Sequence, residues 1–145
     1  MYVEDFEELK TVLQTETTDT NEILIILVSD KEEDTVPLLV EIAKELNLNI
    51  KGGVYPRLIY KMDLKDCGYI IHKVTVAYSG TVVPHLMNFR LPVEEIEGYT
   101  ALILGDGLSS GIEDIITTIS NKLGPKVNYI GGGAGYYNLE HKPCL

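Results

Sequence analysis

Apolar runs, each followed by apolar residues at three- or four-residue steps, organise most of the chain. Residues 23–28 form an unbroken β-favouring run, which is typical of a strand buried on both faces of a sheet. The spacing of the next apolar residues predicts an amphipathic helix, with Asp34 or Thr35 as its N-cap. These residues are Val36, Leu39, Val40, Ala43 and Leu46.

Three further elements surround this strand and helix. Residues 49–60 predict a second strand that Gly52-Gly53 and Pro56 interrupt, and residues 5–13 predict a short helix ahead of the unit. The alternation of apolar and polar residues over 69–78 predicts an antiparallel strand. His72 shares its apolar side, so we expect a core histidine there.

The same succession of elements occurs again in the C-terminal part of the chain. Residues 99–104 predict another buried strand, and Ser110 with Glu113 forms a capping box at the start of the next helix. Gly124-Pro125 ends this helix, and residues 127–130 predict a last strand. The apolar face of the helix is formed by Ile112, Ile115, Ile116, Ile119 and Leu123.

These two successions align as an internal repeat. An offset of 76 positions places Asp30 on Asp106, and a three-residue insertion then brings Gly52-Gly53 onto Gly131-Gly132. Two right-handed βαβ units would also share hydrophobic periodicity without any duplication. We expect an α/β fold, with a mixed β-sheet, flanking helices and two pseudo-repeated βαβ units.

Composition limits the classes of function. The 145 residues suit one compact domain, and 12 Lys and Arg against 22 Asp and Glu give a net charge of −10. This charge repels phosphate backbones and anionic lipids, so nucleic-acid and membrane partners are not expected. Two widely spaced cysteines, Cys67 and Cys144, favour a reduced cytoplasmic setting, and no apolar run is long enough for a membrane helix.

We expect the chain to consist of two parts of unequal length. Residues 1–20 form an N-terminal helix and loop, and residues 21–145 form the α/β domain. A zinc site at His85 or His141 would need ligands from distant parts of the chain, so no metal site is predicted.

Glycine-rich stretches carry a resemblance to a known family. They are Gly105-Asp106-Gly107-Leu108-Ser109-Ser110-Gly111, Lys122-Leu123-Gly124, Tyr129-Ile130-Gly131-Gly132-Gly133-Ala134-Gly135, Lys142-Pro143-Cys144-Leu145 and the earlier segment Ile50 to Tyr60. Together they resemble the FIST domain family of intracellular sensory domains in bacteria and archaea. The resemblance covers residues 22–145, which are similar to the N-terminal half of that family.

The resemblance implies a sensory domain that binds a small ligand, with amino acids or related metabolites as the expected class. It implies no catalysis and no cofactor, and a signalling protein in trans would carry the output. The family's first half normally runs past the Lys-Pro-Cys stretch, whereas this chain stops at Leu145. We therefore expect the chain to be either a fragment or a minimal member of the family.

The candidate ligand-binding residues are glycines and two aspartates. Clustered glycines let a backbone approach a ligand closely, or they form a tight turn. The aspartates either bind the ammonium group of an amino-acid-like ligand or cap the loops that follow them, and capping is favoured. The candidates are Gly131, Gly132, Gly133, Gly135, Gly52, Gly53, Asp106 and Asp30. Tyr136-Tyr137 either walls a pocket or packs against a missing half, and the second is favoured.

Two alternatives to a sensory domain remain open. Gly105, Gly107 and Gly111 lie between a strand and a helix, the place of a nucleotide-binding turn in an enzyme. Asp106 places a negative charge inside that turn, which disfavours pyrophosphate. A structural or homo-oligomerising module without a ligand is the other alternative, since an incomplete sheet exposes an edge.

Overall fold

Parallel strand pairing across a helix occurs twice in this protein. The computed structural model describes residues 1–80 and 97–140. A four-stranded sheet has the order β1-β6-β2-β3, and β7-β8 and β4-β5 form two-stranded sheets. The strands are β1 (Tyr2–Val3), β2 (Glu22–Ser29), β3 (Ile50–Tyr55), β4 (Leu58–Tyr60), β5 (Asp63–Lys65), β6 (Tyr69–Thr75), β7 (Thr100–Asp106) and β8 (Asn128–Ala134).

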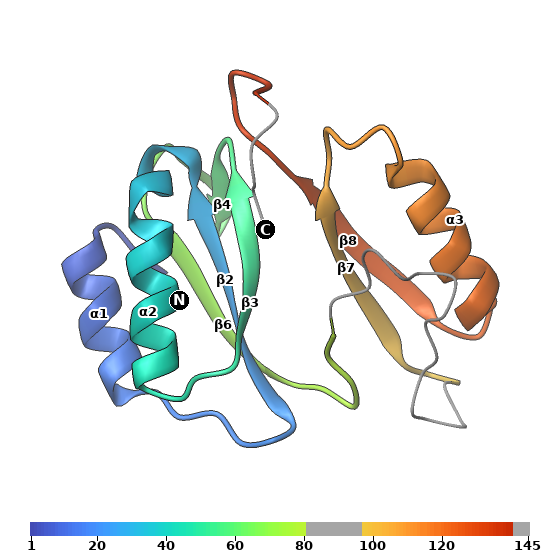
Figure 1. Cartoon of the computed structure of the whole chain (residues 1–145), viewed down its shortest axis with the longest axis horizontal. Coiled ribbons are helices and arrows are strands. Elements are labelled where there is room, and N and C mark those ends of the chain that lie inside the picture. The colour runs from blue at the N-terminus through green and yellow to red at the C-terminus, as the bar shows by residue number, and fades with distance from the viewer. Residues whose placement is uncertain (81–96, 141–145) are drawn as a thin grey trace.

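The helices lie outside the sheets. In Figure 1, α1 and α2 lie together on one side of the four-stranded sheet, while β7, β8 and α3 lie beyond its other side. The helical elements are α1 (Phe6–Thr15), the 3-10 segment η1 (Asp30–Thr35), α2 (Val36–Glu45) and α3 (Ile112–Leu123). This α/β architecture with a mixed sheet confirms the predicted fold class.

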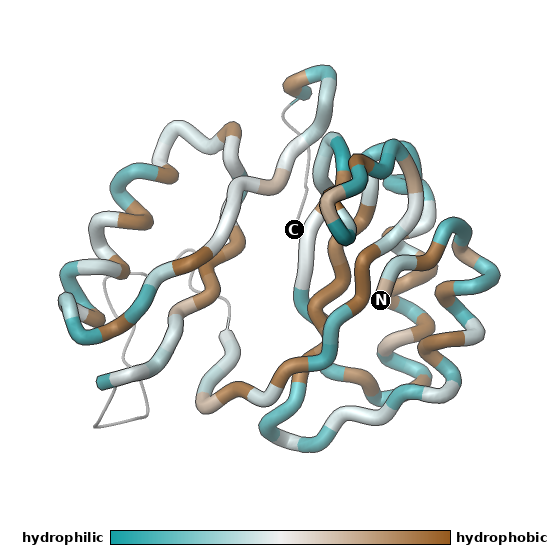
Figure 2. The backbone as a smooth tube through the Cα atoms, turned by 180° about the vertical axis from the view of Figure 1, so that it is seen from behind, coloured by the Kyte–Doolittle hydropathy of each residue, from teal (hydrophilic) through white to brown (hydrophobic). Residues whose placement is uncertain are grey.

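The main core lies between the four-stranded sheet and the two N-terminal helices. Leu24 and Ile26 of β2 contribute to it, with Leu9 of α1 and Leu39 of α2. Hydrophobic residues follow the strands of this sheet in Figure 2. Strand β2 is buried on both faces, as its unbroken apolar run predicts. A smaller core beneath α3 consists of Ile119, Leu123 and Val127.

The N-terminal residues belong to this main core. Strand β1 pairs antiparallel with β6, and Val3 is buried. The predicted short helix is present as α1, where the Asp5 carboxylate accepts a hydrogen bond from the Glu8 amide at 2.9 Å. Strand β6 is antiparallel to β1 and β2, as expected.

Both βαβ units join parallel neighbours, which confirms the paired architecture. In the first unit Gly52 lies opposite Ile26, and in the second Gly131 lies opposite Ile103. A Cβ on either glycine would overlap the carbonyl oxygen of the residue opposite. The two pairs of strands therefore share one close backbone approach that requires glycine.

This register corrects the sequence alignment of the repeat by one position. Strand pairing places Asp106 opposite Ala134 and Ser29 opposite Tyr55. Asp106 is therefore the structural counterpart of Ser29, not of Asp30. Each of these side chains accepts a hydrogen bond from the amide two residues later, at Leu108 and Lys31 respectively.

Two of the glycine-rich segments lie within strands and are not breaks or loops. Gly52-Gly53 lies inside β3, and residues 131–133 lie inside β8. The predicted break at Gly52-Gly53 was wrong, because a glycine is required where two backbones approach closely, which is compatible with a continuous ladder. The predicted break at Pro56 is confirmed, since β3 ends at Tyr55 and β4 begins at Leu58.

Three local predictions were also wrong. No side chain caps α3, whose N-cap is Gly111, so Ser110 and Glu113 form no capping box. Strand β7 is not buried on both faces, since α3 covers only one of them and Leu102 is exposed. His72 is exposed, because within residues 1–80 and 97–140 no helix packs on its side of the four-stranded sheet.

Some sequence predictions fall outside the described residues. These are the surface connection predicted around 86–97, apart from Glu97, together with His85, His141 and the Lys142-Pro143-Cys144-Leu145 stretch.

The close approach of the strands predicts different outcomes for neighbouring glycines. Gly131→Ala should lower the free energy of unfolding by about 1–3 kcal/mol, because the added methyl group forces β7 and β8 apart. Gly132→Ala is the matched control, since a Cβ there meets no atom within 4 Å. It should raise stability by about 0.4–1 kcal/mol. Urea denaturation measures both, and equal effects would contradict the register.

Candidate functional site

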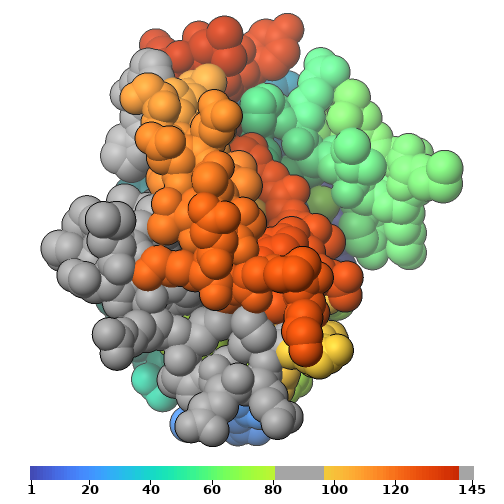
Figure 3. All heavy atoms as spheres, turned by 90° about the vertical axis from the view of Figure 1, so that its right-hand side faces the viewer, coloured from blue at the N-terminus to red at the C-terminus, as the bar shows by residue number. Residues whose placement is uncertain are grey.

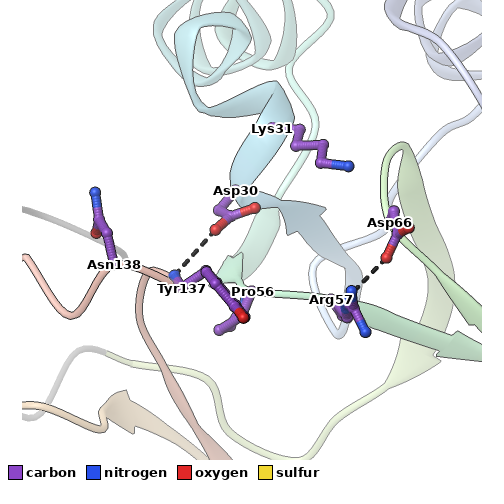
Figure 4. Close-up of a pocket in the computed structure, with 7 residues that line it drawn as sticks. All are labelled: Asp30, Lys31, Pro56, Arg57, Asp66, Tyr137 and Asn138. Atoms are coloured by element: carbon purple, nitrogen blue, oxygen red, sulfur yellow. Dashed lines mark hydrogen bonds and ion pairs between the residues drawn. The ribbon is translucent and has the colours of Figure 1, made fainter.

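An open cleft lies where the first βαβ unit meets the segment that follows β8. Its volume is about 460 Å³. Figure 4 shows its side chains, which come from four separate parts of the chain. They are Asp30, Lys31, Pro56, Arg57, Asp66, Tyr137 and Asn138.

The parallel pairing of β2 and β3 explains why these residues meet. Parallel strands end at the same edge of a sheet, so the residues after Ser29 and after Tyr55 are brought together. Asp30 and Lys31 begin η1, directly after β2. Arg57 follows β3, so it reaches the same edge. The carboxyl end of a parallel strand pair is a common place for ligands in α/β proteins.

Asp30 connects this edge to the second βαβ unit. Its Oδ2 atom accepts a hydrogen bond from the Tyr137 amide at 3.0 Å, across 107 residues of sequence. Nearby, the Gly135 amide donates to the Val54 carbonyl at 2.8 Å. Tyr136 is buried in the main core between these two contacts. The cleft therefore spans the junction of the two units.

The cleft carries charges of both signs. Arg57 Nε lies 2.9 Å from Asp66 Oδ1, and about half of each side chain is exposed. Asp30 and Lys31 add a second carboxylate and a second cation (Figure 4). An exposed ion pair contributes little to stability.

Buried polar groups hold η1 in place beside the cleft. The buried Ser29 hydroxyl donates to the Asp66 carbonyl at 2.8 Å, so it links the ends of β2 and of the segment before β6. The Tyr69 hydroxyl lies 2.7 Å from the Thr35 hydroxyl and donates to the Glu32 carboxylate at 3.3 Å. Burial raises the pKa of Tyr69 to about 12, with the Glu32 charge acting in the same direction.

The predicted site residues separate into several places. Asp30 lines the cleft, whereas Asp106 accepts a hydrogen bond from the Leu108 amide at 2.9 Å and so caps its own loop. Gly52 and Gly131 approach the protein's own backbone. The structure thus gives these two glycines a packing role.

The remaining predicted glycines lie near the junction or on the surface. A Cβ on Gly133 would lie 2.7 Å from the Cα of Gly107, so the loop after β7 presses against β8 there. Gly135 donates the hydrogen bond to β3, and Gly53 lies opposite Leu27. Gly132 faces open space.

Four cleft residues were not singled out from the sequence as charged or polar site groups: Lys31, Arg57, Asp66 and Asn138. Tyr137 lines the cleft and is exposed, as the first of the two expected roles has it. Tyr136 packs in the main core of this chain and not against a missing half. Arg57 directly follows Pro56 at the end of a strand, and this position in the sequence could have marked it as a candidate site residue. No sequence signal marks Asp66 as a site residue, because it reaches this edge only through the β4–β5 hairpin that precedes β6.

The turn after β7 has the wrong polarity for a pyrophosphate group. Asp106 occupies it with a carboxylate, and Glu113 and Asp114 add two more in the first turn of α3. Within residues 1–80 and 97–140 no group of three or more metal-ligating side chains comes together. No helix in the described part of the chain is long and apolar enough to cross a membrane.

Comparisons of this chain with protein-family models, curated proteins and solved structures find no match.

The buried Tyr69 hydroxyl predicts a specific loss of stability in alkali. Unfolded tyrosine ionises near pH 10.0, whereas folded Tyr69 keeps its proton to about pH 12. Its contribution is therefore complete below pH 10.0 and falls as the pH rises toward 12. Urea unfolding at several pH values should show a smaller loss in Tyr69→Phe, which should itself cost about 1 kcal/mol at neutral pH. The same alkaline slope in both proteins would contradict this placement.

Proposed function

We propose that this protein is a sensory domain that binds a small, amino-acid-like metabolite in the cleft beside Asp30. The observation that carries the proposal is the juxtaposition of two carboxylates with two cations at the carboxyl edge of β2 and β3. A zwitterion presents a carboxylate and an ammonium group close together. Both find opposite charges in this cleft.

The geometry gives each charged side chain a role. The Arg57 guanidinium is planar and suits a ligand carboxylate, with which it can form two parallel hydrogen bonds. Lys31 adds a second positive charge at the same cleft. Asp30 and Asp66 are the acceptors for the ligand ammonium group. Pro56 and the exposed Tyr137 ring supply apolar surface for its side chain.

The position of the cleft also supports a sensory role. Asp30 contacts the Tyr137 amide, so a ligand that binds Asp30 acts on the hydrogen bond between the two βαβ units. A ligand bound to both sides shifts the population toward one arrangement of the units. In this proposal a signalling protein in trans reads that arrangement.

The resemblance to the FIST family supports the same conclusion. Of the stretches that carry it, the segment with Pro56 and Arg57 lines the cleft, and Gly135 donates the hydrogen bond to β3 at the junction. We propose that the protein is a cytoplasmic, non-enzymatic member of that family.

A thermal-shift screen tests this proposal. Amino acids and related zwitterions should raise the melting temperature, whereas NAD, ATP and FMN should not. A ligand at about 100 times its dissociation constant adds about 2.7 kcal/mol to the free energy of unfolding. Stabilisation by a nucleotide alone would reverse the proposal and favour the turn after β7.

Charge-removing variants locate the binding site. Asp30→Asn and Arg57→Gln should each weaken the binding of the best zwitterion by about tenfold or more, because a charge-assisted hydrogen bond contributes about 1.5–3 kcal/mol. Asp34→Asn is the matched control, since Asp34 is an exposed carboxylate of η1 outside the cleft. Isothermal titration calorimetry measures all three. Asp30→Asn and Asp34→Asn change the net charge by the same amount, so an equal loss in these two variants would show an effect of net charge and contradict a site at Asp30.

A further inference from the structure

The β4–β5 hairpin begins and ends at two residues of the cleft. Arg57 directly precedes β4 and Asp66 directly follows β5, and both line the cleft. The hairpin pairs Leu58 with Lys65, so Arg57 and Asp66 occupy the next positions in the same register. Their ion pair, at 2.9 Å, therefore closes the base of the hairpin (Figure 4). In Figure 3 the green segment that contains the hairpin projects from the side of the molecule.

This ion pair is a weak link between the two sides of the hairpin. The Arg57 and Asp66 side chains are 51% and 55% exposed, so solvent screens their attraction and the loss of the pair costs little free energy. Another ion pair, between Lys65 and Asp63 at 3.9 Å, lies within β5 and does not connect the strands. Among the described residues, no other ion pair joins the two sides. The base is thus closed by a contact that opens easily.

The tip of the hairpin contributes little to its closure. Lys61 and Met62 have positive φ, at 50° and 69°, as the central residues of a type I′ turn do. Asn-Gly is strongly preferred there, because most side chains are disfavoured at positive φ. The ladder has three residue pairs, and an isolated two-stranded hairpin is marginally stable at best in water. The order of the hairpin therefore depends on its base and on its packing.

Contacts with the rest of the protein hold the ends of the hairpin in place. Leu58 is buried, and the Tyr60 ring stacks on the Tyr2 ring with centroids 5.9 Å apart. After β5, the Asp66 carbonyl accepts a hydrogen bond from the buried Ser29 hydroxyl at 2.8 Å. None of these contacts uses the side chains of the ion pair, so they remain when the pair opens. Opening of the base is therefore confined to the hairpin.

We propose that a ligand bound in the cleft opens the base of the β4–β5 hairpin, so that the order of the hairpin reports whether the cleft is occupied. This inference rests on the proposed function, in which the Arg57 guanidinium binds the ligand carboxylate and Asp66 accepts a hydrogen bond from its ammonium group. A guanidinium and a carboxylate 2.9 Å apart leave no space between them. The ligand therefore forces these two side chains apart and takes the place of their direct contact.

Opening of the base weakens the strand pairing beside it. Leu58 and Lys65 form the first pair of the ladder, directly next to the separated side chains. The ligand contacts both sides of the base only in the open form, so it shifts the population toward that form. A signalling protein in trans would then meet an ordered hairpin when the cleft is empty and a mobile one when it is occupied.

Limited proteolysis of the full chain with trypsin tests this coupling, because Lys61 lies in the turn of the hairpin. When opening is fast, cleavage after Lys61 follows the population of the open hairpin. Millimolar glycine is the probe, since it carries a carboxylate and an ammonium group and no side chain. Glycine should speed up this cleavage about two- to fivefold, which corresponds to the loss of an exposed ion pair. Acetate and methylammonium, which each offer one charge, should leave the rate unchanged, and a reporter peptide digested in parallel corrects for effects on trypsin.

Two variants separate the ion pair from a general effect of charge. Asp66→Asn removes the ion pair but keeps the hydrogen bond from Ser29, which uses the main-chain carbonyl. It should speed up cleavage after Lys61 by the same factor without glycine, and glycine should add nothing further. Glu97→Gln is the matched control, since it removes one negative charge and an exposed ion pair with Lys126, at 2.8 Å, from another part of the chain. Its cleavage after Lys61 should equal that of the wild type.

The outcomes distinguish this inference from the proposed function. If glycine does not raise the melting temperature, recognition of both charges fails, and the coupling fails with it. If glycine stabilises the protein but cleavage after Lys61 is unchanged or slower, the coupling is overturned while the cleft remains a binding site. Equal effects of Asp66→Asn and Glu97→Gln would also overturn the coupling.

Discussion

The cleft depends on the attachment of the segment after β8 to the first βαβ unit. A backbone hydrogen bond from Gly135 to Val54 and the burial of Tyr136 hold this segment against the end of β3. Without these contacts Tyr137 and Asn138 would leave the carboxyl edge of β2 and β3, and Asp30 would lose its long-range partner. The same contacts join the second unit to the main core.

Much of the fold could be predicted because hydrophobic periodicity is a local property. The run over 23–28 gives a strand buried on both faces, and the spacing after it gives α2. Similar periodicity did not reveal that β7 is covered on one face only, because coverage depends on which elements pack nearby. The repeat was recognised, but its alignment was one position out. The correct alignment of the two units follows from the strand pairing, which places Gly131 opposite Ile103 as Gly52 lies opposite Ile26.

The candidate site was harder to predict than the fold. Asp30 was found because it follows a strand, and strand ends are frequent ligand sites in α/β proteins. The clustered glycines were predicted to bind a ligand because of their conformational freedom, yet Gly52 and Gly131 allow the close approach of neighbouring strands. Arg57 and Asp66 meet through the return of the hairpin, a three-dimensional relation that sequence spacing does not contain.

The unequal sizes of the two cores have a consequence for the order in which the molecule opens. The first unit shares a large buried cluster with α1 and β6, whereas among the described residues the buried cluster beneath α3 is formed by Ile119, Leu123 and Val127. Regions with few buried apolar contacts open at lower free energy than the whole molecule does. We therefore expect the second unit to open as a separate cooperative segment, so that its amide hydrogens exchange with solvent while those of β2 remain protected. A signal carried by partial opening of this segment would leave the main core folded.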